Sequence, residues 1–283
     1  MRATTMTTYV VGALLSAAVT GADTAKRPIT PEDIVDIRLV SEPQISPDAK
    51  VVAFVVSEPA DTSKPEDGRN SDIWIVATDG SRPPRKYAFG PRQELMPRWS
   101  PDGLYLAFLS NRGDNKKNQV YIMSTAGGEG ELLTSAKEGM DLFKWDRDSR
   151  GITFISKDSL TADEESRNKA KDDERTLDEN TKYARLYRTE MATRITLLLT
   201  PENENISDFD YAPDGSQLVC VIASSPKSDD IYYRGKLIVM NRDGSARKCI
   251  SEKTLGYVKW SPLGDQILHY TFKGKTLAGL PEL

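Results

Sequence analysis

Few residues of this 283-residue chain could make or break covalent bonds. His269 is its only histidine, the residue type that most often takes a proton from a nucleophilic serine. Such a serine is often presented in a Gly-x-Ser-x-Gly turn, and that string does not occur in the sequence. Neither a His or Cys cluster with metal-ligand spacing nor a glycine-rich phosphate loop is present. The sequence therefore predicts no catalytic, metal-binding or cofactor-binding residue.

A short sequence phrase occurs five times in the chain, and it predicts the strands and turns that would position any functional residue. Each copy is a bulky apolar residue, a turn rich in Ser, Pro, Asp and Gly, and a short apolar run. The copies begin with residues 45–49 (ISPDA), 99–103 (WSPDG), 145–149 (WDRDS), 211–215 (YAPDG) and 260–264 (WSPLG). Counted from the residue after the bulky one, the reference positions 46, 100, 146, 212 and 261 lie 54, 46, 66 and 49 residues apart. This spacing is typical of β-propeller blades.

The register of the repeat extends beyond the turn. Eight residues after the reference positions lie Phe54, Phe108, Phe154, Cys220 and His269. Because the adjacent positions are apolar too, these runs are predicted to be strands buried on both faces between neighbouring sheets. Third and fourth strands joined by Asp-Gly or Gly-Gly turns follow most copies. The predicted fold is an all-β propeller of four-stranded antiparallel blades, and the alternative is an unrelated β-sandwich.

The repeat also predicts the strand positions of His269 and of the two cysteines, and from these their roles. His269 takes the place of phenylalanines in other copies, which favours a packed structural role over catalysis. Cys220 and Cys249 fall on the second and fourth strands of one blade. A whole strand would separate them, at about 4.8 Å per step, so a disulfide is excluded and two buried free thiols are predicted.

The N-terminal residues have a different composition from the rest. An apolar stretch at 9–19 and the small residues at 20–22 predict a signal peptide over 1–22. An uncleaved anchor is the alternative, although the stretch is short for a bilayer. Residues 23–40 are predicted to be a linker and a short helical lead-in, with Thr30 as N-cap. The mature protein is then expected to be exported, to the periplasm or outside the cell.

A charged insertion interrupts the predicted propeller domain at 41–283. It spans 157–183, between the second and third strands of its blade, and predicts a solvated loop or surface helix. A contact element for another domain is the alternative. Shorter polar insertions at 57–70 and 224–234 fall at the same place in their own blades. All three are therefore expected on one face of the propeller, opposite the repeated turns, and that face is the better candidate surface.

Beyond the repeat itself, several segments resemble one family. They are residues 97–112 (PRWSPDGLYLAFLSNR), 119–121 (QVY), 127–129 (GGE), 71–74 (SDIW) and 208–215 (DFDYAPDG). Over about residues 28 to 270, the chain resembles the N-terminal β-propeller of the prolyl oligopeptidase family of serine peptidases. The branch of acylaminoacyl-peptidases and dipeptidyl-peptidases is the most similar. The Ser-Pro-Asp-Gly phrase also occurs in periplasmic Tol-type propellers, which are not enzymes.

The resemblance implies a function in peptide hydrolysis. In that family a seven-bladed propeller covers an α/β-hydrolase domain and filters the peptides that reach a Ser-Asp-His triad. Here about four and a half blades are expected, as an incomplete ring, and the chain as it stands is predicted not to be an enzyme. Some dipeptidyl peptidases hold the amino terminus of a substrate with acidic residues. Glu164-Glu165 and Asp172-Asp173 could imitate them, but both pairs lie in a solvated run of charges.

Two functions therefore remain open from the sequence. The favoured one is the non-catalytic propeller portion of an exported serine exopeptidase or oligopeptidase that lacks its hydrolase domain. The other is a stand-alone Tol-type scaffold for protein interaction. The partners expected are peptide substrates, if a hydrolase domain is joined, or another protein. A net charge of −4 without a basic tract argues against nucleic acid, and no stable membrane span is expected in the mature chain.

Overall fold

The computed structural model describes residues 27–59, 70–114, 116–170, 181–272 and 281–282. Within them the helices are α1 (Pro31–Val35), α2 (Ala162–Lys169) and α3 (Ser228–Tyr233). Blade 1 consists of β1 (Leu39–Ile45), β2 (Val51–Ser57), β3 (Ser71–Ala77) and β4 (Arg85–Ala88). Blade 2 consists of β5 (Glu94–Trp99), β6 (Tyr105–Ser110), β7 (Gln119–Ser124) and β8 (Glu131–Leu132).

The second half of the chain continues the same pattern. Blade 3 consists of β9 (Leu142–Trp145), β10 (Gly151–Lys157), β11 (Ala184–Glu190) and β12 (Thr196–Leu198). Blade 4 consists of β13 (Asn205–Tyr211), β14 (Gln217–Ala223), β15 (Lys236–Asn241) and β16 (Lys248–Ser251). Two-stranded sheets follow, β17 (Val258–Trp260) with β18 (Ile267–His269) and β19 (Thr271–Phe272) with β20 (Pro281–Glu282).

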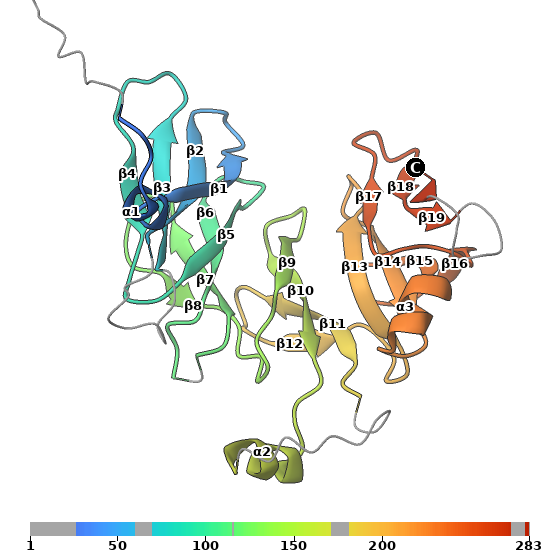
Figure 1. The fold of residues 1–283 in the computed structure, drawn as a ribbon. Coiled ribbons are helices and arrows are strands. Elements are labelled where there is room, and N and C mark those ends of the chain that lie inside the picture. The colour runs from blue at the N-terminus through green and yellow to red at the C-terminus, as the bar shows by residue number, and fades with distance from the viewer. Residues whose placement is uncertain (1–26, 60–69, 115, 171–180, 273–280, 283) are drawn as a thin grey trace, which may run out of the picture.

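The four blades follow one another along an arc. Each blade is an antiparallel sheet whose strands are hydrogen-bonded in chain order. Figure 1 shows β1, β5, β9, β13 and β17 on the inner side of the arc and the fourth strands on its outer side. In the part of the chain that the structure describes, no strand pairing joins the first sheet to the last. The predicted incomplete propeller of four-stranded blades is therefore confirmed.

The repeated turns owe their shape to side chains within the phrase. The Ser46 hydroxyl donates to Asp48 Oδ1 at 2.6 Å and accepts the Val51 N–H at 3.0 Å. Ser100 forms the same two bonds with Asp102 and Tyr105, at 2.6 and 2.9 Å. The residue after the aspartate position has positive φ in every copy: Ala49 58°, Gly103 72°, Ser149 61°, Gly215 72° and Gly264 78°. Glycine adopts this conformation without strain, which explains its frequency at the end of the phrase.

The row of residues eight positions after the reference lies at equivalent places in successive blades. Phe108, Phe154 and Cys220 are each the fourth residue of a second strand and are at most 2% exposed. Each lies in a core cluster that it shares with the preceding blade. Phe54 has the same place in β2 but is only partly buried. Face-to-face packing of successive blades therefore forms the core, as the repeat predicted.

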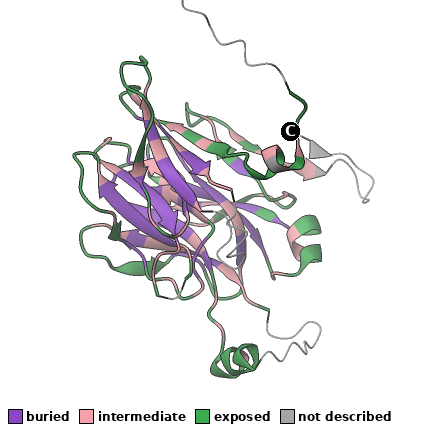
Figure 2. Cartoon of the chain, turned by 60° about the vertical axis from the view of Figure 1, so that its left-hand side comes forward, coloured by how far each residue is buried: buried purple, intermediate pink, exposed green. Residues whose placement is uncertain are grey.

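The charged insertion at 157–183 was predicted to be a solvated loop or a surface helix. Part of the charged insertion is the surface helix α2, in which no residue is buried. Thr161 caps it, since its hydroxyl accepts the Glu164 N–H at 3.3 Å and its N–H donates to Glu164 Oε2 at 2.6 Å. Figure 2 shows buried residues concentrated on the sheets, whereas α2 is exposed. Residues 171–180, and with them Asp172-Asp173, lie outside the described residues.

The cysteine prediction is partly wrong. Both thiols are free, and Cys220 is buried as predicted, but Cys249 is exposed. Cys249 lies on β16, the fourth and outermost strand of blade 4, which pairs on one side only among the described residues. Burial inferred from the repeat register alone overlooked this difference between second and fourth strands.

The N-terminal predictions are only partly within the described residues. The predicted signal peptide at 1–22 lies outside them. The helical lead-in is present as α1, and the Thr30 N–H donates to Asp33 Oδ2 at 2.8 Å. Among the described residues, no helix is both long and apolar enough to cross a bilayer.

Candidate functional site on the inner strands

The inner strands carry polar side chains at equivalent positions. Two residues before the reference positions of the repeat lie Gln44, Arg98, Lys144, Asp210 and Lys259. We refer to these five residues as the inner polar row. The strands that carry the row occupy the inner side of the arc in Figure 1, and of its five members only Lys259 is exposed.

β-Bulges shape the inner strands of three blades. The register shifts fall between Ser41 and Gln44, between Leu95 and Arg98, and between Ile206 and Asp208. Glu42 and Met96 have positive φ, 52° and 53°, within the first two bulges. A bulge bends a strand and changes the direction of its side chains. The bulges therefore interrupt the regular alternation of side chains beside the inner polar row.

Ion pairs connect the row from blade to blade. Arg98 Nη1 of β5 lies 3.9 Å from Glu42 Oε2 of β1. Lys144 Nζ of β9 lies 3.1 Å from Asp210 Oδ1 of β13 and also donates to the Phe209 carbonyl. Lys259 Nζ of β17 lies 3.4 Å from Asp210 Oδ2. Asp210 therefore sits between two lysines from the neighbouring sheets.

The protonation of the row reflects burial and these partners. Burial lowers the pKa of Lys144, although Asp210 acts in the opposite direction. Burial alone would raise the pKa of Asp210, but Lys144 and the Trp260 N–H, at 2.9 Å, outweigh it and leave that pKa lowered. Burial raises the pKa of the neighbouring Asp208, despite the Val258 N–H at 3.0 Å. Through the hydrogen bonds that they accept from Val258 and Trp260, these two aspartates fix the backbone of β17 to blade 4.

The chemistry open to the row is binding. Guanidinium and ammonium groups donate hydrogen bonds, and carboxylates and the Gln44 amide accept them. A lining with charges of both signs suits the backbone and the charged ends of a peptide. The row contains no serine, threonine or cysteine. Its side chains can therefore donate and accept hydrogen bonds to a polar ligand.

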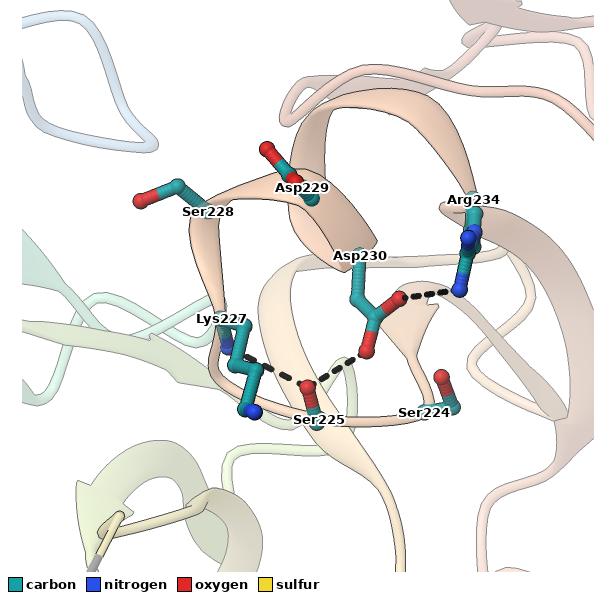
Figure 3. A pocket seen from close by; sticks show the side chains of 7 residues that line it. All are labelled: Ser224, Ser225, Lys227, Ser228, Asp229, Asp230 and Arg234. Carbon is teal, nitrogen blue, oxygen red and sulfur yellow. Dashed lines mark hydrogen bonds and ion pairs between the residues drawn. The ribbon is translucent and has the colours of Figure 1, made fainter. Parts of the chain in front are cut away.

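A second candidate lies in the insertion between β14 and β15. Ser224, Ser225, Lys227, Ser228, Asp229, Asp230 and Arg234 line an open depression of about 630 Å³. Figure 3 shows Asp230 at its centre: Oδ2 accepts the Ser225 hydroxyl at 2.5 Å, and Oδ1 accepts Arg234 Nη1 at 3.2 Å. These two partners hold the pKa of Asp230 below its usual range, Ser225 more strongly. Because the central carboxylate is already satisfied within the insertion, this site is the weaker candidate.

A polar cluster between blades 3 and 4 has a structural role. Asp146 is fully buried, accepts the Tyr211 hydroxyl at 2.6 Å, and is 2.7 Å from Arg188 Nη2. The Tyr211 hydroxyl also lies 2.6 Å from Thr153 Oγ1. Burial and the adjacent Asp146 raise the pKa of Tyr211. A closed network of this kind stabilises a blade interface and is not open to a substrate.

The chemistry-bearing residues named from the sequence are not brought together. His269 lies in β18, with Nδ1 3.1 Å from Thr254 Oγ1, and is partly buried. Glu164 belongs to α2, where it caps the helix and pairs with Lys182 Nζ at 2.6 Å. The sequence reasoning missed the inner polar row. Its signal was available, because a polar residue stands two positions before every reference position.

Comparison with curated proteins relates the chain to peptidases. No family model matches it. Over 129 residues, 45% of this chain and 19% of the relative, it is 40% identical to the uncharacterized peptidase YuxL of Bacillus subtilis. Over 109 residues, 38% of this chain and 15% of the relative, it is 30% identical to dipeptidyl-peptidase 5 of Porphyromonas gingivalis. The chain thus spans less than a fifth of the length of these curated relatives.

Solved structures with the same fold include peptidases and a putative TolB. An acylaminoacyl peptidase of Pyrococcus horikoshii matches with a TM-score of 0.60 and 17% identity, over 83% of this chain and 36% of that chain. The β-propeller domain of the Trilobed protease of Pyrococcus furiosus matches with 0.56 and 15% identity, over 85% and 65%. A putative TolB of Agrobacterium tumefaciens matches with 0.53 and 18% identity, over 85% and 72%. At these identities the matches show the fold alone.

Sequence and fold agree on the relationship. The sequence matches are to two proteins named as peptidases, and the fold matches include peptidase propeller domains. The chain therefore resembles, as its sequence predicted, the β-propeller portion of serine peptidases of the prolyl oligopeptidase family.

Proposed function

We propose that this chain is the non-catalytic propeller portion of a serine exopeptidase or oligopeptidase. In this proposal the propeller admits extended peptides to an α/β-hydrolase domain that lies outside these 283 residues. The inner polar row contacts the peptide on its way, and the chain itself cleaves nothing. The observation that carries the proposal is the 40% identity to a peptidase over 129 residues.

The inner polar row supports the filtering role. Its charged members, together with Glu42 and Asp208, comprise three cations and three carboxylates, so the lining has no net charge of its own. Such a lining can hydrogen-bond to peptides of either charge but offers little to a folded apolar surface. In this proposal the partly exposed members of the row, Gln44, Arg98, Lys144 and Lys259, contact the peptide, and no catalytic residue is needed.

The proposal includes a cellular location and a domain arrangement. Residues 1–22 act as a signal peptide, 23–40 as linker and helical lead-in, and 41–283 as propeller with its insertion at 157–183. The protein is exported to the periplasm or the medium. N-terminal sequencing of exported protein should start near residue 23, and a start at residue 1 would argue for an uncleaved anchor.

The first test is the DNA sequence that follows the codon for Leu283. A reading frame for Gly-x-Ser-x-Gly followed by Asp and His is expected, because that is the order of an α/β-hydrolase triad. An unrelated gene in that place would contradict the proposal.

The second test measures the filter in the chain joined to that hydrolase domain. Lys144→Glu should change kcat/KM for peptides of about six residues by about fivefold or more, and leave a small acylated chromogenic substrate unaffected. Lys248→Glu, on the outer strand β16, is the matched control. Equal effects of both substitutions on both substrates would remove the inner row from the filter.

A Tol-type interaction scaffold is the second candidate. The observation in its favour is that the chain covers 72% of the putative TolB chain, against 36% of the acylaminoacyl peptidase. This candidate predicts a protein partner that co-purifies with the exported chain, and no hydrolase gene beside it. The downstream DNA sequence therefore separates the two candidates.

A further inference from the structure

A cavity of about 540 Å³ lies between blades 1 and 2, beside the repeated turns of both blades. Its apolar walls are formed by Val51, Ile75, Tyr87 and Trp99. Its charged groups belong to Asp48, Arg85 and Asp102, and all three of these residues are exposed. Sites for small ligands commonly measure about 300–1,000 Å³ and combine apolar walls with a few polar groups. The cavity has both the size and the lining of such a site.

Two small side chains account for this space. Five residues after the reference position of the repeat, blade 1 has Val51 where blade 2 has Tyr105. Directly after the third strand, blade 2 has Thr125 where blade 3 has Met191, and both residues donate their N–H to the residue before the second strand. Tyr105 and Met191 pack against the core cluster between blades 2 and 3, whereas Val51 and Thr125 line the cavity. Small residues at both positions therefore leave open between blades 1 and 2 what larger side chains fill at the next interface.

Hydrogen bonds hold the two aromatic walls in place. Trp99 Nε1 donates to the Gln44 carbonyl of β1 at 3.0 Å, across the interface. The Tyr87 hydroxyl donates to the Ser124 carbonyl of β7 at 3.0 Å, in the opposite direction. Since both donors are used in these bonds, the two rings contribute apolar surface to the cavity.

Two of the charged groups have no ion-pair partner in the described part of the chain. Asp102 uses Oδ1 for the hydrogen bonds of its own turn, and its Oδ2 accepts none. The Arg85 guanidinium lies 5.6 Å from the centre of the Tyr87 ring and contacts no carboxylate. Asp48, by contrast, has Oδ2 3.6 Å from Lys50 Nζ. One carboxylate and one guanidinium are therefore available to a ligand at the edge of an apolar cavity.

We propose that this cavity binds a zwitterion with a large apolar side chain, either a free amino acid or a dipeptide. Trp99 and Tyr87 contact the apolar side chain, the ammonium group of the ligand donates to Asp102, and its carboxylate accepts from Arg85. A planar guanidinium suits a carboxylate in particular, because it can donate two parallel hydrogen bonds. The site uses none of the side chains of the inner polar row, and nothing in this inference depends on a hydrolase domain.

The test is isothermal titration calorimetry of the full chain with L-phenylalanine and with the dipeptide L-leucyl-L-phenylalanine. A Kd of about 0.1–1 mM is expected, because ligands of this size have few atoms with which to bind. The tighter of the two ligands identifies the source of the zwitterion. Phenethylamine lacks the carboxylate and 3-phenylpropionate lacks the ammonium group, so each should bind at least about fivefold more weakly than L-phenylalanine.

Substitutions that fill the cavity test its location. Val51→Tyr combined with Thr125→Met introduces the residues of the next interface and should raise the Kd at least about tenfold, since a filled space admits no ligand. Melting curves followed by circular dichroism establish whether this variant folds. Thr125→Met alone changes an exposed residue, should raise the Kd at least about threefold, and decides the question if the double variant does not fold.

Charge substitutions test the two polar contacts. Arg85→Gln and Asp102→Asn should each raise the Kd about fivefold or more. Asp214→Asn is the control for Asp102, because Asp214 has the same place in the phrase of blade 4, and Arg82→Gln at a nearby exposed position is the control for Arg85. Both controls should leave the Kd unchanged. The proposal is overturned if neither zwitterion binds at about 10 mM, if the folded cavity-filling variants bind as the wild type does, or if the controls weaken binding equally. Affinities for phenethylamine and 3-phenylpropionate equal to that for L-phenylalanine would also overturn it.

Discussion

Phe108 and Phe54 occupy the same position of the repeat but not the same environment. Phe108 is fully buried, in a core cluster that includes Ala53 and Val55 of blade 1. Phe54 faces the opposite side of blade 1 and is only partly buried. The bulky residue that begins each phrase shows the same contrast between blades. Ile45 of blade 1 is 60% exposed, whereas Trp145 of blade 3 is 7% exposed.

The difference shows where the stability of this fold originates. Each blade presents one apolar face to the blade before it and another to the blade after it. The faces between blades are filled by the clusters around Phe108, Phe154 and Cys220. The first face of blade 1 has the same residue types but no preceding blade among the described residues. Burial is thus a property of the neighbouring blade as much as of the residue.

The largest expected effect is a difference between two phenylalanine truncations. Phe108→Ala should lower the free energy of unfolding by about 3–5 kcal/mol, because it leaves a cavity between blades 1 and 2. Phe54→Ala should cost about 1–2 kcal/mol, since less apolar surface is lost. Urea denaturation of both variants measures the two losses. Equal losses would mean that the outer face of blade 1 is covered as fully as the interface.

The polar interface between blades 3 and 4 allows a second comparison with blade 1. Asp146 and Ser46 both stand at a reference position, but Asp146 is bound to Arg188 within blade 3 and to Tyr211 across the interface, in blade 4. Asp146→Ala should lower the free energy of unfolding by about 3 kcal/mol, because it removes the carboxylate partner of the largely buried Arg188 guanidinium. Ser46→Ala loses only local turn bonds and should cost about 1 kcal/mol. Thermal and urea unfolding together test this ranking, which a larger loss for Ser46→Ala would reverse.

Glu94 makes the interface of blades 1 and 2 sensitive to pH. It is fully buried, and burial raises its pKa to about 7, although Arg112 Nη2 lies 2.7 Å away. The folded protein then keeps this proton up to about pH 7, whereas the unfolded chain releases it near pH 4.5. The stabilisation from this group is therefore complete below pH 4.5 and is lost as pH rises towards 7. The loss amounts to about 3 kcal/mol.

Glu94→Gln provides the control for this pH dependence. The variant cannot titrate at this position, so its free energy of unfolding should fall less between pH 4.5 and 7 than that of the wild type. Urea denaturation at several pH values measures both slopes. Parallel slopes would show that Glu94 stays ionised beside Arg112 throughout this range.

The sequence predicted what the repeat encodes and little else. The phrase and its register were sufficient for the blades, their strand order and the equivalence of Phe54, Phe108 and Phe154, because local turns and apolar strands determine these features. The exposure of Cys249 was not predictable, since it depends on the position of β16 at the outer rim. The partial exposure of Phe54 depends likewise on a neighbouring sheet.

The candidate site shows the same limit. The inner polar row was visible as a pattern, but its meaning depends on which strand lies on the inner side of the arc. The pairing of Lys144 with Asp210 joins residues 66 positions apart, and no local pattern specifies it. The described part of the charged insertion, by contrast, was recognised as surface structure, because its composition alone predicts its exposure.

The smallest expected effect compares the two lysines that flank Asp210. The Lys144 side chain is 24% exposed and Lys259 is 53% exposed, so water screens the second pair more strongly. Lys144→Ala removes the less exposed partner of a carboxylate that is only 3% exposed and should cost about 1–2 kcal/mol. Lys259→Ala should cost about 0.5 kcal/mol or less. Both costs should shrink in about 1 M salt, and Lys259→Ala should lose the larger fraction, since screening acts on exposed charges first. If the two variants were equally destabilised, the last strands would pack on the row as closely as blade 3 does.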